Sequence, residues 1–358
     1  MCAGAEVLVG KSPDQGIASR TARLRKALTG GSVSIPRYQP GGPLEVRFLG
    51  RGATNTAWQI ITDSDAFVLR VPHRSAEEAP RPMKDEFAAL ARVPTGVGTR
   101  GIAFDDSADN PLGHRYVLTT FVPGQIKDAA QWEASDFARL AKTLARLHTV
   151  EEALAGPVHA PEHDQVSLSG HLEAGLQWWK ESHPTLFKNP DIASLVPVVQ
   201  AFVRRCEDKG GVARRFSLIH GDLIVGNVVS DGDDMSLIDW EWAEYGDVAQ
   251  DLAYIGGTIH GGPDYAPMTQ DLINYFVDQY VAEMRRAGKD TEDASTLRAR
   301  RAGWEACERF LTLMHTMTSP QNDETRLTIT SVRRTLMKTV CSPPNKPPTS
   351  GEHTAGKN

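Results

Sequence analysis

The sequence predicts an α+β fold of two unequal lobes, in which a small β-rich lobe with one main helix precedes a larger, mostly helical lobe. Three observations predict this fold. Five strand-like runs lie between residues 44 and 122, with one helical run after the third. Beyond Pro123-Gly124, apolar residues recur mainly at helical spacing. With 358 residues, the chain is long enough to bury a substantial core.

The first 43 residues are expected to form an N-terminal extension. Apolar residues at helical spacing predict a short helix over residues 16–28, and Gly30-Gly31 would end it. Residues 36–43 are rich in proline and glycine and predict a linker. The N-terminus has neither a basic start nor a long apolar run, so it does not resemble a signal peptide.

Residues 44–122 are expected to form the smaller lobe. Each strand-like run is rich in β-branched or aromatic residues and is bounded by turn residues. The helical run carries apolar residues on one face. The predicted strands are 44–49, 57–62, 66–71, 101–104 and 115–122, and the predicted helix is 83–92.

Residues 123–341 are expected to form the larger lobe. Amphipathic periodicity predicts helices over residues 135–148, 172–180, 192–205, 272–287 and 295–317. The last segment, residues 342–358, is polar and begins with a proline-rich run. Such a composition cannot bury enough apolar surface to fold, so a disordered tail is expected there.

One segment of the larger lobe carries several oxygen-bearing side chains, and their spacing along the chain indicates a function. His220-Gly221-Asp222 is followed by Asn227, and Asp239 comes after an apolar run. Asp222 and Asn227 are separated like the Asp and Asn of a kinase catalytic loop, and Asp239 stands where a kinase keeps its main magnesium carboxylate. A lone His-Gly-Asp triplet would more simply be a capped turn, but the three features together favour phosphoryl transfer.

The same region resembles the aminoglycoside phosphotransferase family, which are small-molecule kinases of the protein-kinase-like fold. The resemblance is carried by His-Gly before Asp222, by Ile238-Asp239-Trp240-Glu241, and by the run from Gly246-Asp247 to Asp251-Leu252-Ala253. It covers residues 48–253 in recognisable pieces and is absent from the last hundred residues. It implies the protein-kinase-like two-lobe fold, with the nucleotide bound by residues 44–122 and the acceptor bound by residues 123–341.

Three residues are expected to perform the chemistry. The Asp222 carboxylate would accept a hydrogen bond from the acceptor hydroxyl and orient it towards the γ-phosphorus. Asn227 and Asp239 would bind Mg²⁺, which prefers oxygen ligands and keeps several waters. A buried, unpaired carboxylate at Asp239 would be costly, and a metal ion removes that cost.

The nucleotide is expected to contact three segments of the smaller lobe. Glycines in a loop let backbone amides approach the phosphates, and an Arg fork can hold two phosphate oxygens and a carboxylate. An ordinary surface Arg beside a helix Glu is the alternative. The connection between lobes would pair with the adenine edge. The expected residues are Gly50, Gly52, Asn55, Arg70, its partner Glu86, Thr120, Phe121 and Val122.

Four other polar residues are expected to be structural. His220 would hold the loop through backbone hydrogen bonds, and Asp247 and Asp251 would support the catalytic loop from below. His148 is expected to pack inside the larger lobe.

The acceptor side is specified less well. Aromatic and acidic groups together suit a polyhydroxylated or cationic ligand. A core role is the stronger interpretation of the tryptophans, and Glu241 is compatible with a place near the metal, with contact to the acceptor or with no role. The candidate residues are Trp178, Trp304, Glu241, Glu244, Glu308 and Asp264.

The sequence therefore predicts an ATP- and Mg²⁺-dependent phosphotransferase that acts on a hydroxyl of a small molecule, with GTP also open. The resemblance implies an antibiotic of the aminoglycoside, nucleoside or macrolide type and a role in resistance. A kinase of an amino alcohol or a sugar, or a nucleotide-binding pseudokinase, are alternatives. No Asp-Phe-Gly occurs, and the one Ala-Pro-Glu (residues 160–162) precedes the Asp222 segment, whereas a protein kinase has it after the metal-binding Asp; both points argue against a protein kinase.

Composition excludes several other classes. A net charge of −6 argues against a general nucleic-acid binder. The four cysteines (Cys2, Cys206, Cys307 and Cys341) lack paired spacing, which argues against a disulfide framework or a cysteine zinc site. No run approaches the roughly 18 apolar residues that span a membrane, so a cytoplasmic location without a membrane partner is expected. The sequence does not predict an oligomeric state.

Overall fold

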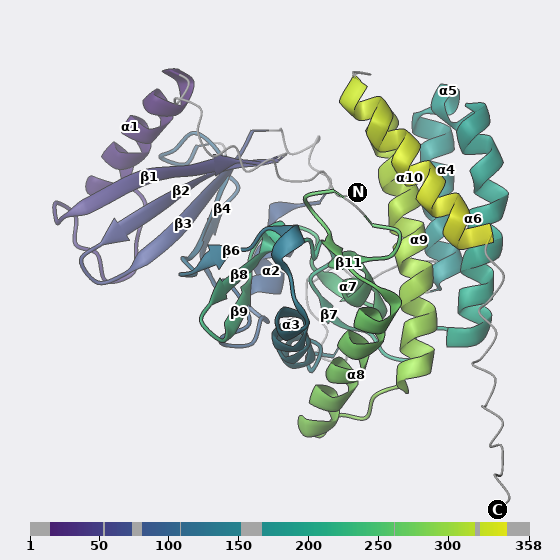
Figure 1. The fold of residues 1–358 in the computed structure, drawn as a ribbon. Helices are drawn as coiled ribbons and strands as arrows, with labels where there is room; N and C mark the ends of the chain where they lie inside the picture. Colours follow the sequence, from purple (N-terminus) through teal and green to yellow (C-terminus); the bar gives the residue numbers. More distant parts are fainter. Residues whose placement is uncertain are drawn as a thin grey trace, which may run out of the picture.

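The structure is a computed structural model that describes residues 15–52, 54–73, 81–107, 109–151, 167–260, 262–318 and 323–341. It has the predicted α+β architecture. A β-rich N-lobe carries helix α1 on one side, and a larger helical C-lobe lies against it (Figure 1). The expected tail over residues 342–358 lies outside the described residues.

The N-lobe is built on a five-stranded antiparallel sheet of order β1-β2-β3-β5-β4. Burial alternates along β2, where Trp58 and Ile60 face inward, as expected for a strand with one buried face. Its elements are α1 (Gln15–Thr29), β1 (Leu44–Arg51), β2 (Asn55–Thr62), β3 (Ala66–Pro72), α2 (Met83–Leu90), β4 (Gly101–Asp105) and β5 (Tyr116–Thr120).

Helix α1 shares a core with this sheet. Leu24 and Leu28 of the helix pack in one apolar cluster with Trp58, Ile60 and Leu69 of the strands. The Trp58 indole Nε1 donates a hydrogen bond of 2.9 Å to the Thr21 hydroxyl. Residues 15–43 are therefore packed onto the N-lobe and are continuous with its core.

The C-lobe is a set of helices around a second, larger apolar cluster. Helices α6 and α9 lie side by side, and α3 packs against α8 (Figure 1). The helices are α3 (Ala134–Leu147), α4 (Leu168–Ser182), α5 (Pro184–Phe187), α6 (Pro190–Gly210), α7 (Val248–Tyr254), α8 (Gln270–Arg286), α9 (Ala294–Thr318) and α10 (Asp323–Cys341).

Short strands between the helices position the motif residues. β8 and β9 form a hairpin that β6 extends, and β7 pairs with β10. The short elements are β6 (Gln125–Ile126), η1 (Ala129–Gln131), β7 (Ser217–Ile219), η4 (Val225–Asn227), β8 (Val228–Asp231), β9 (Asp234–Leu237), β10 (Glu244–Gly246), β11 (Gly256–Gly257) and β12 (Ala266–Pro267).

Helix α2 packs against β4 of the N-lobe, and its apolar face also belongs to the core cluster of the C-lobe. Leu90 and Val97 lie in the same apolar cluster as the C-lobe helices. The segment after α2 pairs with the C-lobe at Gly98 and Leu237, where Leu237 donates to the Val97 carbonyl at 2.8 Å. A side chain at Gly98 would collide with the Leu237 carbonyl, so this close approach requires glycine.

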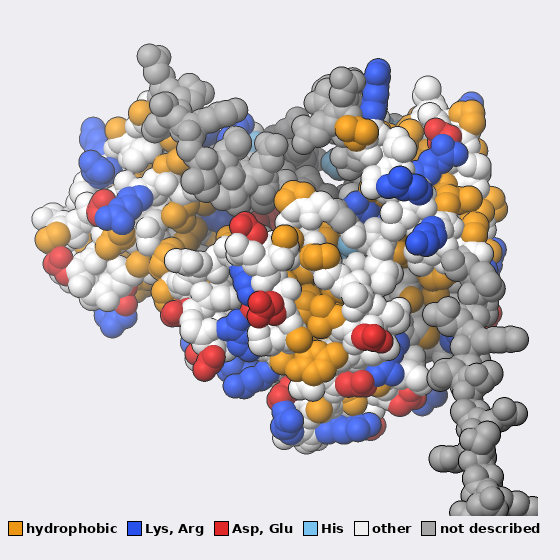
Figure 2. Space-filling model, in the orientation of Figure 1, with side chains coloured by type: hydrophobic (Ala, Val, Ile, Leu, Met, Phe, Trp, Pro, Cys, Tyr) orange, Lys and Arg blue, Asp and Glu red, His pale blue; other side chains and the backbone are white. Residues whose placement is uncertain are grey.

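The surface is mixed in charge. On the face shown in Figure 2, basic and acidic side chains are interspersed over both lobes. Within the described ranges, no helix is both long and apolar enough to cross a membrane.

Candidate active site

The catalytic-loop motif lies between β7 and the short helix η4. Asn227 donates from Nδ2 to the backbone carbonyl of Asp222 at 2.8 Å and lies 3.4 Å from its Oδ2. Ile238 donates its backbone amide to the Asn227 carbonyl at 3.0 Å, which joins the loop to the residue before Asp239. The local fold thus brings Asp222, Asn227 and Asp239 to one place, although 17 positions separate the first from the last.

A buried carboxylate holds this loop from behind, as expected. Asp251 of α7 accepts the backbone amides of His220 (2.8 Å) and Gly221 (3.0 Å). It also accepts a hydrogen bond from Nε2 of His148 at 3.2 Å. The other ring nitrogen of His148, Nδ1, lies 2.9 Å from the Tyr280 hydroxyl. Burial alone would raise the pKa of Asp251, but the His148 and backbone hydrogen bonds outweigh it and lower the pKa. Asp251 therefore stays ionised and fixes the loop.

His220 ties the catalytic loop to the strand that leads to Asp239. Its Nε2 lies 2.9 Å from the Ile238 carbonyl, which can only accept, so Nε2 carries the proton. Nδ1 then accepts from the Asp222 amide at 3.4 Å. Complete burial lowers the pKa of His220, which keeps the imidazole neutral. His220 thus has the expected structural contacts.

Gly221 allows the loop to pass close to β10. It has φ +76°, and a side chain there would collide with the Trp242 carbonyl. Only glycine meets both conditions without strain.

Arg70 of β3 links two carboxylates from different elements. One guanidinium nitrogen pairs with Glu86 of α2 and the other with Asp239. Asp239 itself has φ +64°, one of two non-glycine residues with positive φ in the described chain. Such strained backbone is kept where the surroundings over-determine it, and it is concentrated at functional sites.

A cavity of about 470 Å³ lies between the lobes, and Arg70, Glu86 and Asp239 are among the residues that line it. Asp222 and Asn227 line it as well. Leu49 of β1 and Ile126 of β6, one from each lobe, also line it and are each 43% exposed. Exposed apolar side chains together with charged groups suit a ligand with a planar apolar part and a polar tail.

The glycine-bearing loop, of which residues 50–52, 54 and 55 are described, lines the N-lobe side of this cavity. Gly52 donates its amide to the Asn55 carbonyl at 2.8 Å, and Thr54 accepts from the His73 amide at 3.0 Å. The side chains of Thr54 and Asn55 both reach Glu241 of the C-lobe. Glu241, a candidate for the acceptor side, therefore lies under the loop.

In the connection between lobes, two of the backbone amides expected to face a nucleotide base already donate within the protein. The amide of Thr120 donates to the Arg100 carbonyl and that of Phe121 to the Ala66 carbonyl, each at 3.0 Å. Phe121 and Val122 line the cavity, whereas Thr120 does not, and Thr119 does.

The cavity offers oxygen donors for a divalent cation. Asn227 uses Nδ2 on Asp222, so its Oδ1 is the amide atom left for a cation, and Asp239 adds a carboxylate. Across the parts of the chain that the structure describes, no three His, Cys, Asp or Glu side chains form a metal cluster. One amide and one carboxylate oxygen fit an ion that retains water and phosphate ligands, as Mg²⁺ does.

Acidic candidates for the acceptor side lie beside the catalytic loop. Glu244 pairs with Arg81, which also donates to the Trp242 carbonyl at 2.8 Å and lies 5.0 Å from the centre of the Trp242 ring. Asp264 accepts the Val225 amide through its backbone at 3.0 Å, and burial raises the pKa of its side chain.

The remaining acceptor candidates lie on helices. Trp304 is buried and donates from Nε1 to Asp247 at 2.8 Å, which is a core contact. Glu308 is buried and accepts from the Thr312 hydroxyl at 3.0 Å. Trp178 is 40% exposed on α4 and stacks edge-on against Trp179.

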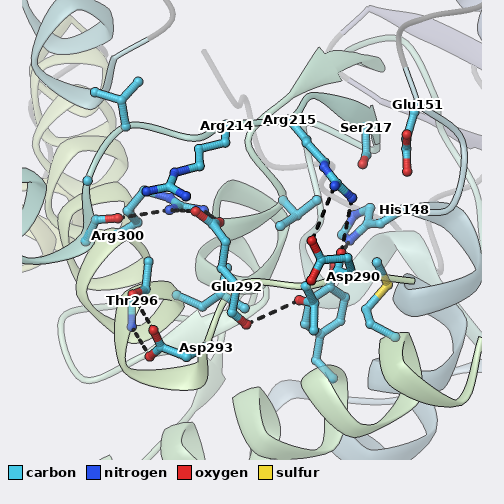
Figure 3. A pocket seen from close by; sticks show the side chains of 18 of the residues that line it. His148, Glu151, Arg214, Arg215, Ser217, Asp290, Glu292, Asp293, Thr296 and Arg300 are labelled. Atoms are coloured by element: carbon cyan, nitrogen blue, oxygen red, sulfur yellow. Dashed lines mark hydrogen bonds and ion pairs between the residues drawn. The ribbon is translucent and has the colours of Figure 1, made fainter. Parts of the chain in front are cut away.

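A second cavity of about 670 Å³ lies in the C-lobe and is lined by residues of α6, α8 and α9 (Figure 3). Its charged side chains largely pair with one another: Arg300 with Glu292, and Arg215 with Asp290. Two of its lining residues also contact α7: His148 contacts Asp251, and Arg300 pairs with Asp247, the N-cap residue of that helix. None of the catalytic motif residues lines it.

Sequence reasoning missed two residues that join the lobes here. Thr54 could have been considered because it stands next to Asn55 in the loop. Arg81 follows a segment with no periodic pattern, and its contacts with residues 242–244 depend wholly on the tertiary fold.

Comparison with known proteins gives a family match. The profile of the phosphotransferase enzyme family matches residues 45–310, which is most of the chain. No curated protein sequence matches.

Solved structures with similar folds include three kinases of small molecules. Amicoumacin kinase in complex with AMP-PNP, Ca²⁺ and Ami has TM-score 0.62 at 12% identity, covering 91% of this chain and 96% of that one. Ethanolamine kinase of Plasmodium vivax has TM-score 0.61 at 15% identity, covering 92% and 89%. The streptomycin–ATP–APH(2")-IIa complex has TM-score 0.58 at 12% identity, covering 91% and 97%. At these identities the likeness concerns the fold.

Proposed function

This chain belongs to the phosphotransferase enzyme family, and we propose that it transfers the γ-phosphoryl group of ATP, with Mg²⁺, to a hydroxyl of a small-molecule antibiotic. The observation that carries the proposal is that Asp222, Asn227, Asp239 and Arg70 line one interlobe cavity together with the apolar side chains of Leu49 and Ile126. That arrangement supplies a group for the acceptor, oxygen ligands for a cation and a cation for the phosphates.

In this proposal Asp222 accepts the hydrogen bond of the acceptor hydroxyl and aligns its oxygen with the γ-phosphorus. Because the transition state is loose, alignment contributes more than early deprotonation. Asn227 contacts the Asp222 side chain, and the backbone amides of His220 and Gly221 donate hydrogen bonds to Asp251. These contacts hold Asp222 in place.

On the nucleotide side, Leu49 and Ile126 would enclose the base, and the Val122 amide is the donor we assign to its edge. The amides of Thr120 and Phe121 already donate within the protein. Asn227 and Asp239 would hold Mg²⁺, which neutralises charge on the phosphates. Arg70 would turn from Asp239 towards a phosphate oxygen while keeping Glu86.

For the acceptor, we propose an amino-bearing antibiotic of the aminoglycoside type, with nucleoside and macrolide antibiotics next. Glu244 and Asp264 lie beside the catalytic loop and would face an amino group. Among the proteins of similar fold are kinases named for an antibiotic and for ethanolamine. An amino alcohol or a sugar is therefore the second candidate acceptor class.

Mass spectrometry of a pooled acceptor panel tests the proposal. The panel holds aminoglycoside, nucleoside and macrolide antibiotics, together with amino alcohols and sugars, incubated with Mg-ATP or Mg-GTP. We expect one compound to gain a phosphate. Asp222→Asn should melt like the wild type but transfer about 10²- to 10⁴-fold more slowly, since it lacks the orienting carboxylate.

Asp234→Asn is the matched control, because Asp234 is an exposed residue of β9. Undiminished transfer by Asp222→Asn would refute the assigned role of Asp222. ATP binding without transfer to any panel member would favour the pseudokinase alternative.

A further inference from the structure

A hydrogen-bonded link joins the roof of the nucleotide cavity to its floor. The Thr54 hydroxyl lies 2.7 Å from Glu241 Oε2 and 3.0 Å from Oε1. Asn55 Nδ2 donates to the same Oε2 at 3.1 Å. Two adjacent residues of the N-lobe loop therefore share one carboxylate of the C-lobe.

The two ends of this link belong to different lobes. The loop is fastened to the N-lobe, where Thr54 accepts from the His73 amide at the end of β3 and Asn55 begins β2. Glu241 follows Trp240, which is buried in the C-lobe core and donates from Nε1 to the Leu237 carbonyl at 3.2 Å. The link can therefore persist only while the loop lies low over the cavity.

The chemistry of the link favours a positioning role. A hydroxyl and an amide that donate to a carboxylate form charge-assisted hydrogen bonds, which are stronger than neutral ones. All three residues line the 470 Å³ cavity, so the link forms part of the wall around a bound ligand. Thr54 and Asn55 contact Glu241 through side-chain atoms, so the link itself uses none of the loop's backbone amides.

We propose that Glu241 is a positioning residue: through Thr54 and Asn55 it holds the described residues of the glycine-bearing loop closed over the phosphates of the bound nucleotide. This inference rests on the proposed function, since it assumes that the cavity binds a nucleoside triphosphate. It assigns Glu241 to loop closure in place of the acceptor wall.

Paired variants of Thr54 and Glu241 test the link. Thr54→Val keeps the shape of the side chain and removes its hydroxyl, whereas Thr54→Ser keeps the hydroxyl. Glu241→Gln removes the charge and places an amide against the Asn55 amide. Thr62→Val is the control, because the Thr62 hydroxyl donates to Asp65 in a turn of the same lobe.

The readout is the Kd of Mg-ATP and of adenosine, measured by calorimetry, with steady-state KM and kcat where an acceptor is known. We expect Thr54→Val and Glu241→Gln each to raise the Kd of Mg-ATP about tenfold, the size of one charge-assisted hydrogen bond. Adenosine has no phosphates for the loop to cover, so its Kd should stay within about twofold. Thr54→Ser should recover most of the affinity.

The double variant adds a second criterion. If Thr54 and Glu241 act as one unit, Thr54→Val with Glu241→Gln should weaken Mg-ATP binding little more than either change alone. Full additivity would overturn the proposal. An equal loss of adenosine binding would overturn it too, because it would mean general damage to the cavity.

Two further outcomes separate this proposal from its premise. If the wild type binds Mg-ATP and all variants bind it equally well, the link has no positioning role and the proposed function stands. If Glu241→Gln alone raises the Mg²⁺ concentration needed for binding and Thr54→Val has no effect, Glu241 is a metal ligand and the proposal is wrong. If the wild type does not bind Mg-ATP, both proposals fail.

Discussion

Arg70 serves carboxylates on two elements at once, Glu86 on α2 and Asp239 beyond β9. A planar guanidinium can do this because its nitrogens diverge at fixed angles. Lysine offers a single ammonium, so Arg70→Lys would satisfy one partner at the expense of the other. We expect about a tenfold or greater rise in the KM for ATP, since one charge-assisted pair is lost.

Steady-state kinetics of Arg70→Lys beside Arg47→Lys would check this prediction. Arg47 is exposed on β1 and pairs with Glu45, so its replacement should not affect the KM for ATP. Equal KM values for wild type and Arg70→Lys would show that the fork is dispensable.

At the residue scale, spacing alone predicted the polar residues that meet in the cavity. Asp222, Asn227 and Asp239 follow a motif in one continuous segment, so local sequence carries their proximity. The Thr54–Glu241 contact joins residues 187 positions apart, and no local pattern encodes it. The positive φ of Asp239 likewise follows from the tight turn between β9 and Trp240, which composition does not reveal.

At the scale of elements, helix α7 supports the catalytic loop through one side chain. Asp251 accepts two loop amides and a His148 ring nitrogen while fully buried. Asp251→Asn would replace one acceptor oxygen with a donor that faces an amide. Leaving a buried amide unsatisfied costs about 1–3 kcal/mol, and losing the charge adds to this cost.

Urea denaturation would show this cost as a lower free energy of unfolding for Asp251→Asn. Asp271→Asn is a suitable comparison because Asp271 is exposed in the first turn of α8. A wild-type midpoint for Asp251→Asn would mean that the loop is held by other contacts.

Most long periodic elements could be predicted from sequence, and the short ones could not. The five strands of the sheet and the helix between the third and fourth are confirmed, as are the helices corresponding to α3, α4, α6, α8 and α9. Helix α7 has seven residues, too few for a 3.6-residue period to stand out. Strands β6 to β12 have two to four residues and show no alternation. Helix α10 was also not predicted.

At the scale of the whole molecule, buried histidines predict a loss of stability in mild acid. Burial lowers the pKa of His171 and His220, and lowers that of His260 well below its usual range. The unfolded imidazoles titrate near pKa ~6.5, so below that pH the unfolded state binds more protons than the folded state. The stability from these groups is therefore present above pH ~6.5 and declines as the pH falls.

Urea midpoints measured at pH 7.5, 6.5 and 5.5 would test this expectation, with about the same ionic strength throughout. The midpoint should fall over the last interval. Asp251 contributes only in stronger acid, because its pKa is lowered from that of an ordinary carboxyl. A midpoint that stays constant or rises down to pH 5.5 would contradict the prediction.

The contacts that α2 and the segment after it make with the C-lobe also affect how the chain folds during its synthesis on the ribosome. The N-lobe strands emerge first, but Leu90, Val93 and Val97 share an apolar cluster with many residues of the later C-lobe. The backbone pairing of Gly98 with Leu237 can form only after Leu237 has been synthesised, long after Gly98. A fragment of residues 15–122 should therefore be expressed largely insoluble, whereas residues 15–341 should be soluble; a soluble, cooperatively melting fragment would contradict this. The nascent N-lobe would thus depend on its own C-lobe, or on a chaperone, to cover this surface until synthesis is nearly complete.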